Sequence, residues 1–190
     1  MKTAESPPVL LRNAALWPLS VAAYRALGEA GLIPKNTELL YGLVYKKMPK
    51  SPYRCFLIQF LLELVQRSLP KGLIVRTEQP ITCEDSEPEP DVAVVKGGKE
   101  DYRHEHPATA ELVIEVCVTS HEYDRSKLRA YAAARVRECW LVLAPEKQIE
   151  VHRQTTGGQF SERVVAGPGG QLVSISVPSF AVDLAALFAK

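Results

Sequence analysis

Residues 111–118 constrain the fold most, because after Glu111 they are apolar on both faces of a predicted strand except at Glu115. A strand with one face in water alternates apolar and polar residues, whereas a strand covered on both faces is apolar throughout. The pattern therefore predicts a central strand of a sheet. A buried carboxylate is costly unless it is paired, protonated or bound to a cation, so Glu115 also requires a partner.

Two more charged residues are placed to meet Glu115. Asp91 opens a short apolar strand over residues 91–95, and Lys127 lies two turns into the helix predicted after the Glu115 strand. If the two strands are neighbours, both carboxylates can converge on one ion, and the helix can bring the lysine beside Glu115. Magnesium bound by carboxylates stabilises phosphate charge and activates water, which a nearby lysine can orient. The pattern favours metal-dependent cleavage of phosphodiesters.

Helices and strands alternate along the chain, which predicts a mixed α/β fold with extra C-terminal β-hairpins. A narrow polar stripe on the second helix predicts that this helix packs deeply. The expected helices span residues 20–31, 51–69, 119–134 and 183–188. The expected strands span residues 38–48 as two short strands or a hairpin, 73–83, 91–95, 111–118, 138–144, 148–153, 160–165 and 172–177.

Composition and charge narrow the class of protein. The chain has 190 residues, 46% of them hydrophobic, and a net charge of +1, so a nucleic-acid site has to be a local patch. The four cysteines show no metal-ligand spacing, and we expect reduced core residues. Neither a signal peptide nor a membrane span is recognisable, so we expect a cytoplasmic protein with no membrane contact. A flexible leader over residues 1–16 and a single domain over residues 17–190 are expected.

Five motifs occur in order: residues 38–44 (ELLYGLV), 90–95 (PDVAVV), 112–116 (LVIEV), 123–132 (YDRSKLRAYA) and 139–142 (CWLV). Each motif is weak alone. Their order and spacing together resemble the Uma-type endonucleases of bacteria, which are part of the PD-(D/E)XK restriction-endonuclease-like superfamily. The resemblance covers nearly the whole chain after residue 17.

The resemblance implies a restriction-endonuclease-like core, with a mixed sheet of four or five strands flanked by helices. It implies a divalent metal at Asp91 and Glu115, with Mg²⁺ expected and Mn²⁺ as the alternative, and DNA as substrate. In the wider superfamily the lysine lies two positions after the glutamate, where this chain has Cys117. Lys127 matches a lysine that has moved to the following helix, and Glu38 matches the N-terminal acid that completes such sites.

Two features depart from the family pattern. Tyr41 precedes Gly42 where an aspartate is common, and no histidine begins the helix after the first strands, where residues 53–55 are Tyr, Arg and Cys. These changes concern substrate contacts and leave the proposed metal-binding core intact.

Simpler roles are open for each site residue. Asp91 can cap the turn after Pro90, as aspartate often does. Glu115 can form a structural ion pair with an arginine or with Lys127, because charged residues are almost never fully buried unless paired. Read alone, Glu38 is a surface or turn residue and Lys127 is a solvated helix lysine.

Other polar residues receive secondary roles. Asp124 is expected to stabilise the N-terminus of its helix, Glu78 is a weak candidate for the same cleft, and His152 is expected to be exposed. Two groups of basic residues could contact DNA phosphates or could be scattered solvated charge. The first group is Lys46, Lys47, Lys50 and Arg54, and the second is Arg125, Arg129, Arg135 and Arg137.

Three hypotheses follow. The first is a magnesium-dependent DNA endonuclease in which Asp91 and Glu115 hold the metal and Lys127 assists the attacking water, with Glu38 completing the site. The second is a non-catalytic DNA-binding or protein-interaction domain on a degenerate nuclease scaffold. The third is a structural α/β dimer with a buried Glu115–Lys127 ion pair. A homodimer would also suit cleavage of both DNA strands.

Overall fold

The computed structural model describes residues 16–119 and 121–189. The leader expected over residues 1–16 lies outside the described residues except for Leu16. In the part of the chain that is described, no helix combines the length and apolar character that crossing a membrane requires.

Helices and strands alternate in the described residues much as the sequence predicts. The helices are α1 (Val21–Glu29), α2 (Pro52–Ser68), α3 (His121–Ala133) and α4 (Leu184–Leu187), with one 3₁₀ helix, η1 (Lys99–Tyr102). The strands are β1 (Thr37–Leu40), β2 (Leu43–Lys46), β3 (Leu73–Arg76), β4 (Val92–Lys96), β5 (Leu112–Cys117), β6 (Glu138–Leu143), β7 (Gln148–Thr156), β8 (Gln159–Ala166), β9 (Gln171–Val173) and β10 (Ala181–Asp183).

The central sheet has six strands in the order β3-β4-β5-β6-β7-β8. β5 and β6 are parallel and joined by α3, whereas the other neighbouring pairs are antiparallel, so the sheet is mixed as predicted. β5 lies in its interior, which confirms the predicted central strand. The sheet exceeds the expected four or five strands because the β7–β8 hairpin continues it, and only β9 and β10 form a separate C-terminal pair.

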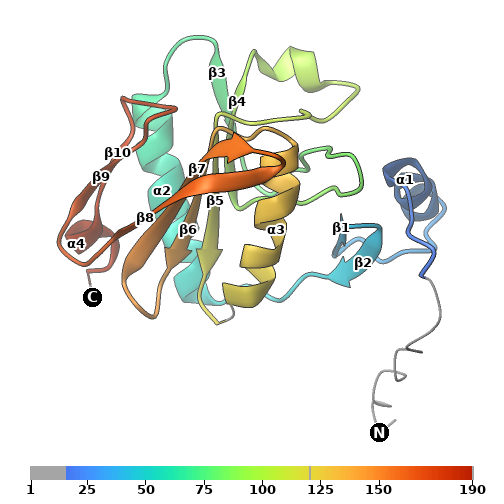
Figure 1. Cartoon of the computed structure of the whole chain (residues 1–190), viewed down its shortest axis with the longest axis horizontal. Coiled ribbons are helices and arrows are strands. Elements are labelled where there is room, and N and C mark those ends of the chain that lie inside the picture. Colours follow the sequence, from blue (N-terminus) through green and yellow to red (C-terminus); the bar gives the residue numbers. More distant parts are fainter. Residues whose placement is uncertain (1–15, 120, 190) are drawn as a thin grey trace, which may run out of the picture.

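Helices cover both faces of this sheet (Figure 1). Leu61 of α2 and Ile114 of β5 belong to the core on one face, whereas Tyr131 of α3 and Val113 of β5 belong to the core on the other. Successive side chains of a strand point to opposite faces. Glu115 therefore lies on the face that α3 covers.

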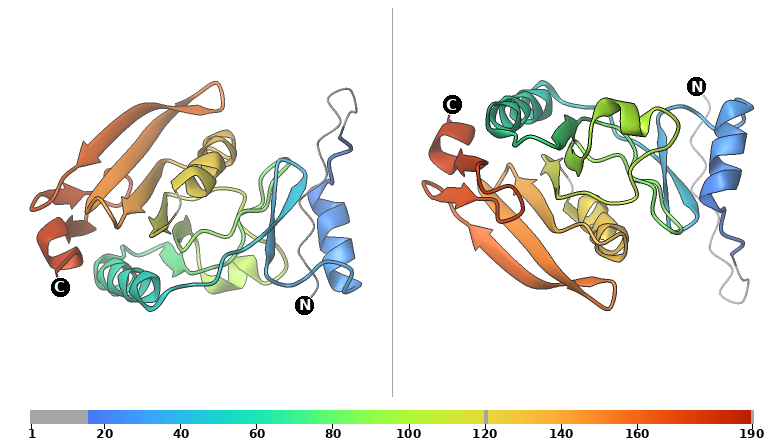
Figure 2. Two further views of the ribbon diagram at one scale, coloured as in Figure 1. Left: turned by 90° about the horizontal axis from the view of Figure 1, so that it is seen from below. Right: turned by 90° about the horizontal axis from the view of Figure 1, so that it is seen from above.

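The β1–β2 hairpin lies beside α1 at one end of the molecule, opposite the end formed by β9, β10 and α4 (Figure 2). Leu39 of β1 forms an isolated bridge with Glu87, which fixes the hairpin against the loop before β4. Gly42 has a φ of 75°, and a Cβ there would lie 2.3 Å from Cβ of Pro18, so only glycine fits this turn. The hairpin is thereby fixed with β1 fully buried.

Three expectations about burial are wrong. α2 packs through one face only, since Phe56 is 51% exposed and the buried residues are confined to a single stripe. Cys55, also on α2, is exposed, whereas the other three cysteines are buried and reduced. His152 lies on β7 and is buried because β8 extends the sheet beside it. The ring centre of Phe160 on β8 lies 6.1 Å from the ring centre of His152.

Candidate active site

Sheet register brings the two predicted metal ligands together. Val92 of β4 pairs with Ile114 of β5, so Asp91 and Glu115 each lie one residue beyond this pair, at the same end of the paired segment. Asp91 is fixed there because its Oδ2 accepts a hydrogen bond of 2.7 Å from the N–H of Val116. Both acids are buried. The expectation that the two strands are neighbours is confirmed.

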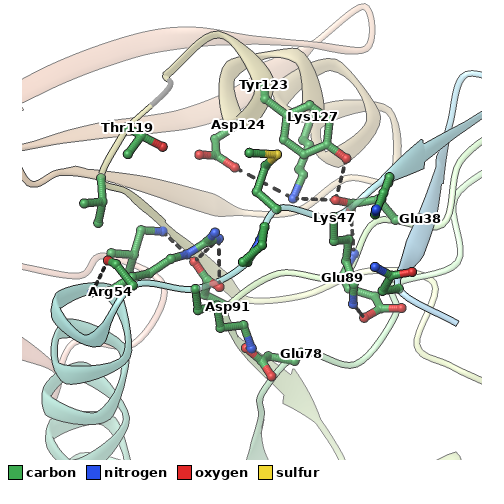
Figure 3. A pocket seen from close by; sticks show the side chains of 18 residues that line it. Glu38, Lys47, Arg54, Glu78, Glu89, Asp91, Thr119, Tyr123, Asp124 and Lys127 are labelled. Carbon is green, nitrogen blue, oxygen red and sulfur yellow. Dashed lines mark hydrogen bonds and ion pairs between the residues drawn. The ribbon is translucent and has the colours of Figure 1, made fainter. Parts of the chain in front are cut away.

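Lys127 lies among three carboxylates on the α3 side of the sheet. Its Nζ is 3.2 Å from Oε1 of Glu115, 3.2 Å from Oε1 of Glu38 and 3.8 Å from Oδ1 of Asp124. The hydroxyl of Tyr131, one turn further along α3, donates to the same Glu115 oxygen over 2.6 Å. Figure 3 shows Lys127 between Asp124 and Glu38. α3 thus brings the lysine beside Glu115 as expected.

Burial sets the protonation of this cluster. Burial raises the pKa of Glu115 to about 8, against the opposing effect of the Lys127 charge. Burial alone would lower the pKa of Lys127, but the carboxylates of Glu115, Glu38 and Asp124 outweigh it and raise that pKa. Lys127 is therefore an ammonium ion at neutral pH. It can donate hydrogen bonds and neutralise charge, but it cannot accept a proton.

Glu38 is brought to the site by the β1–β2 hairpin. Its Oε1 accepts from the hydroxyl of Tyr123 at 2.6 Å, and its Oε2 accepts from the N–H of Glu89 at 3.1 Å. Together with the Lys127 contact, both carboxylate oxygens are bonded. Glu38 is therefore a buried member of the cluster rather than the surface or turn residue that it resembles when read alone.

Asp91 has a different cationic partner from Glu115. Arg54, in the first turn of α2, places its Nη2 3.1 Å from both carboxylate oxygens of Asp91. The start of the helix is set by Ser51, whose hydroxyl accepts from the N–H of Arg54 at 3.2 Å. The two acids lie at the same end of the paired segment, yet one is paired with Arg54 and the other with Lys127.

A pocket of about 870 Å³ opens over these side chains (Figure 3). Its lining charges divide by exposure: Glu38, Asp91, Asp124 and Lys127 are buried, whereas Lys46, Lys50 and Glu78 are exposed. Glu115 is fully buried and does not line the pocket. The pocket therefore has a mainly acidic inner wall, and its opening carries Lys46 together with the Lys50–Glu78 ion pair.

The inner residues suit a hard divalent cation in part. Oε2 of Glu115 is buried without a hydrogen-bond partner among the described residues. Four carboxylates, when ionised, face the two cations Arg54 and Lys127, which leaves two negative charges. Within residues 16–119 and 121–189, however, no three His, Cys, Asp or Glu side chains are grouped to hold a metal. Ligands besides side chains, such as waters and a substrate phosphate, would complete such a site.

Two residues of the site received other roles in the sequence analysis. Asp124 was assigned to the helix terminus, although its i, i+3 spacing to Lys127 already placed both on one helix face. Arg54 was grouped with the exposed lysines, and no local pattern indicates its contact with Asp91, which joins residues 37 positions apart.

Tyr41, which departs from the family pattern, connects the hairpin to α3. Its hydroxyl accepts a hydrogen bond of 3.1 Å from the N–H of Ala130, and the guanidinium of Arg129 lies 4.2 Å from its ring centre. The tyrosine thus helps to hold β1, and with it Glu38, against the helix that carries Lys127.

Comparisons with known proteins bear on the family and the fold of this chain. The family model of Uma2, described as a putative restriction endonuclease, matches residues 34–185. The crystal structure of a putative nuclease belonging to DUF820 from Anabaena variabilis shares the fold with a TM-score of 0.76 at 14% identity, covering 90% of this chain and 98% of that chain. A comparison with curated proteins found no match. The family and the nuclease-like fold that the motifs indicated are confirmed, and the chain belongs to the Uma2 family of putative restriction endonucleases.

Proposed function

We propose that this protein is a metal-dependent DNA endonuclease that hydrolyses phosphodiester bonds. One observation carries the proposal: Asp91 is hydrogen-bonded to the N–H of Val116, the residue after Glu115, and Glu115 contacts the Lys127 ammonium beside an open pocket. Family membership and the shared fold support a nuclease. The metal, the roles of individual residues and the DNA substrate are our proposal.

Each residue has a chemical role in this proposal. Asp91 and Glu115 would hold Mg²⁺ or Mn²⁺, which supplies charge stabilisation at the phosphate and a more acidic water. Lys127 donates hydrogen bonds that orient the attacking water or neutralise a phosphate oxygen, while Glu38 keeps its Nζ in place. The water oxygen bonds to phosphorus, and the bond from phosphorus to the 3′ oxygen breaks. The water proton leaves to solvent because Lys127 is already protonated, and the departing 3′ oxygen takes a proton from solvent to become a hydroxyl.

The expected setting follows from this substrate. An enzyme that cuts DNA would work in the cytoplasm, the compartment that the sequence analysis expects. A homodimer would allow both strands to be cut, and light scattering on the purified chain would test it.

A non-catalytic DNA-binding or protein-interaction domain is the second candidate. One observation favours it: each proposed metal ligand already has a cation partner, Arg54 for Asp91 and Lys127 for Glu115. In this alternative the ion pairs are structural, and the protein would bind DNA without cutting it.

Nicking of supercoiled plasmid with Mg²⁺ or Mn²⁺ tests the proposal. We expect wild type to nick, and Asp91→Asn and Glu115→Gln each to lower the rate at least about a hundredfold. Glu63→Gln, which changes an exposed acid on α2, is the matched control and should nick normally. Equal nicking by all four proteins would reject the assignment of the site. DNA binding without nicking by wild type would support the non-catalytic alternative.

A further inference from the structure

Arg54 occupies both oxygens of a proposed metal ligand. Its Nη2 lies 3.1 Å from Oδ1 and 3.1 Å from Oδ2 of Asp91, and its side chain is 21% exposed. A carboxylate so engaged can bind a metal ion only if the guanidinium shifts. Figure 3 shows Arg54 reaching from the start of α2 over Asp91, at the wall of the pocket. Arg54 therefore stands where a cation bound to Asp91 would stand.

The guanidinium also has donors that Asp91 does not use. Both contacts to Asp91 come from Nη2, whereas Nε is buried without a hydrogen-bond partner in the part of the chain that the structure describes. Leaving a buried donor unsatisfied destabilises the folded state. The planar fork of arginine matches the geometry of a phosphate, which can accept two parallel N–H bonds. Arg54 is thus incompletely satisfied in the absence of a ligand.

Charge explains when Arg54 would exchange Asp91 for another hydrogen-bond acceptor. A divalent cation on Asp91 removes the need for a second positive charge beside that carboxylate and repels the guanidinium. A phosphodiester brings one negative charge into the same pocket. The ion and the phosphate together would release Arg54 from Asp91 and give it a new acceptor.

We infer that Arg54 is a phosphate-binding residue that neutralises Asp91 while no metal is bound and transfers its hydrogen bonds to the DNA phosphate when metal and substrate enter. This inference rests on the proposed function. It makes one distinctive claim: Arg54 opposes binding of metal alone and favours binding of DNA.

Arg54→Gln tests the inference through two readouts that do not require cleavage. The first is the rise in melting temperature produced by Mn²⁺ without DNA. The second is the affinity for a short fluorescein-labelled duplex with Ca²⁺, measured by anisotropy at several salt concentrations. Arg67→Gln, at the other end of α2 and exposed, is the matched control. Arg54→Lys keeps the charge without the fork, and it serves the same comparison if Arg54→Gln does not fold.

Opposite changes in the two readouts are expected. Arg54→Gln should bind Mn²⁺ about tenfold more tightly and DNA about tenfold more weakly, and the salt slope of DNA affinity should fall by about 0.9, the value for one lost phosphate contact. Arg54→Lys should also lose DNA affinity, by a smaller factor, and Arg67→Gln should match wild type.

Other outcomes overturn the inference in distinguishable ways. If wild type responds to metal and DNA but Arg54→Gln weakens both or changes neither, Arg54 is a structural partner of Asp91, and the proposed nuclease stands without this inference. If wild type responds to Mn²⁺ neither alone nor with DNA, the metal-dependent function fails and the inference fails with it.

Discussion

At the scale of single residues, the site is a cluster in which cations are outnumbered. Lys127 alone faces Glu38, Glu115 and Asp124 within 3.8 Å. Removing this ammonium would leave three neighbouring carboxyl groups without their shared cation. Removing one carboxylate would leave Lys127 with two. The two kinds of substitution should therefore differ strongly in their effect on stability.

Lys127→Met should lower the free energy of unfolding by about 3–5 kcal/mol, the range for breaking a buried ion pair from one side. Glu115→Gln should cost less than about 1 kcal/mol, because the amide oxygen still accepts from Tyr131 and burial of an acid is avoided. Urea unfolding at neutral pH measures both. A larger loss for Glu115→Gln than for Lys127→Met would contradict this charge balance.

The sequence predicts part of this cluster. Asp91, Glu115 and Lys127 are each visible because a charge opens, interrupts or follows an apolar strand within a short stretch of chain. Arg54 is not visible in this way. Its partner lies 37 residues away, and only the packing of α2 on the sheet brings the two together.

At the scale of elements, α3 is tied to the sheet by a second ionic cluster. Glu150 of β7 accepts hydrogen bonds from Arg125 of α3 at 2.5 Å and from Arg163 of β8 at 2.6 Å. Burial alone would raise the pKa of Glu150, but the two arginines outweigh it and lower the pKa to about 2. Arg125, which the sequence analysis grouped with residues that could contact DNA, therefore helps to hold the helix that carries Lys127.

This cluster predicts a dependence of stability on pH. The folded-state pKa of Glu150 lies below its ordinary value of about 4.5, so its contribution is complete above pH 4.5 and is lost as pH falls toward 2. Glu150→Gln should be less stable at pH 7 by about 2 kcal/mol, a value reduced for the exposure of both arginines. The difference from wild type should close between about pH 4.5 and 2, as followed by thermal unfolding.

The matched control is Glu162→Gln on β8, whose carboxylate is 30% exposed and pairs with Arg153. Glu162→Gln should lower the stability at pH 7 by less than Glu150→Gln does. If the two variants lose the same stability and show the same pH profile, Glu150 has no special role in holding α3.

Element positions follow from local signals, whereas their extent depends on tertiary pairing. Ser20 and Ser51 cap α1 and α2 where the sequence places the helix starts. The strand expected over residues 73–83 ends at Arg76, because the residues beyond it pair with a loop: the N–H of Glu78 donates to the carbonyl of Pro90, and that of Ile81 to Pro88. The residue pattern of this segment does not show which part pairs with a strand and which part pairs with a loop.

At the scale of the whole molecule, the sheet places opposite charges at different depths of one pocket. The buried lining is mainly acidic, and Lys46 and Lys50 lie exposed at its opening, where Lys50 is paired with Glu78. Although the net charge of the chain is only +1, the acids and the lysines of this pocket are separated in space. This arrangement suits a cation at the buried lining and a phosphate backbone at the opening.

The exposed lysines should contribute to DNA affinity without a role in the chemistry. The double variant Lys46→Gln/Lys50→Gln should bind a DNA duplex about tenfold more weakly, with a salt slope smaller by about 1–2 as phosphate contacts are lost. Fluorescence anisotropy at several salt concentrations measures both quantities. Lys71→Gln/Lys99→Gln changes two exposed lysines that do not line the pocket. Equal effects of the two double variants would mean that the pocket opening does not bind DNA.

Fold class could be predicted because alternating helices and strands and one fully apolar strand limit the arrangements that bury them. The mixed sheet, its central strand and the covering helices are confirmed. The sixth strand was not foreseen, because whether a hairpin extends a sheet or stands apart depends on long-range pairing rather than on its own sequence.

The most direct test of the central claim is calorimetric titration of Mn²⁺ into wild type and Glu115→Gln, each with a short DNA duplex, followed by plasmid nicking with the same samples. DNA is included because a substrate phosphate can complete a site that the side chains alone do not. We expect wild type to bind Mn²⁺ and to nick, and both signals to be lost in Glu115→Gln. Equal binding by the two proteins, or no binding by wild type with DNA present, would contradict a metal site at Asp91 and Glu115.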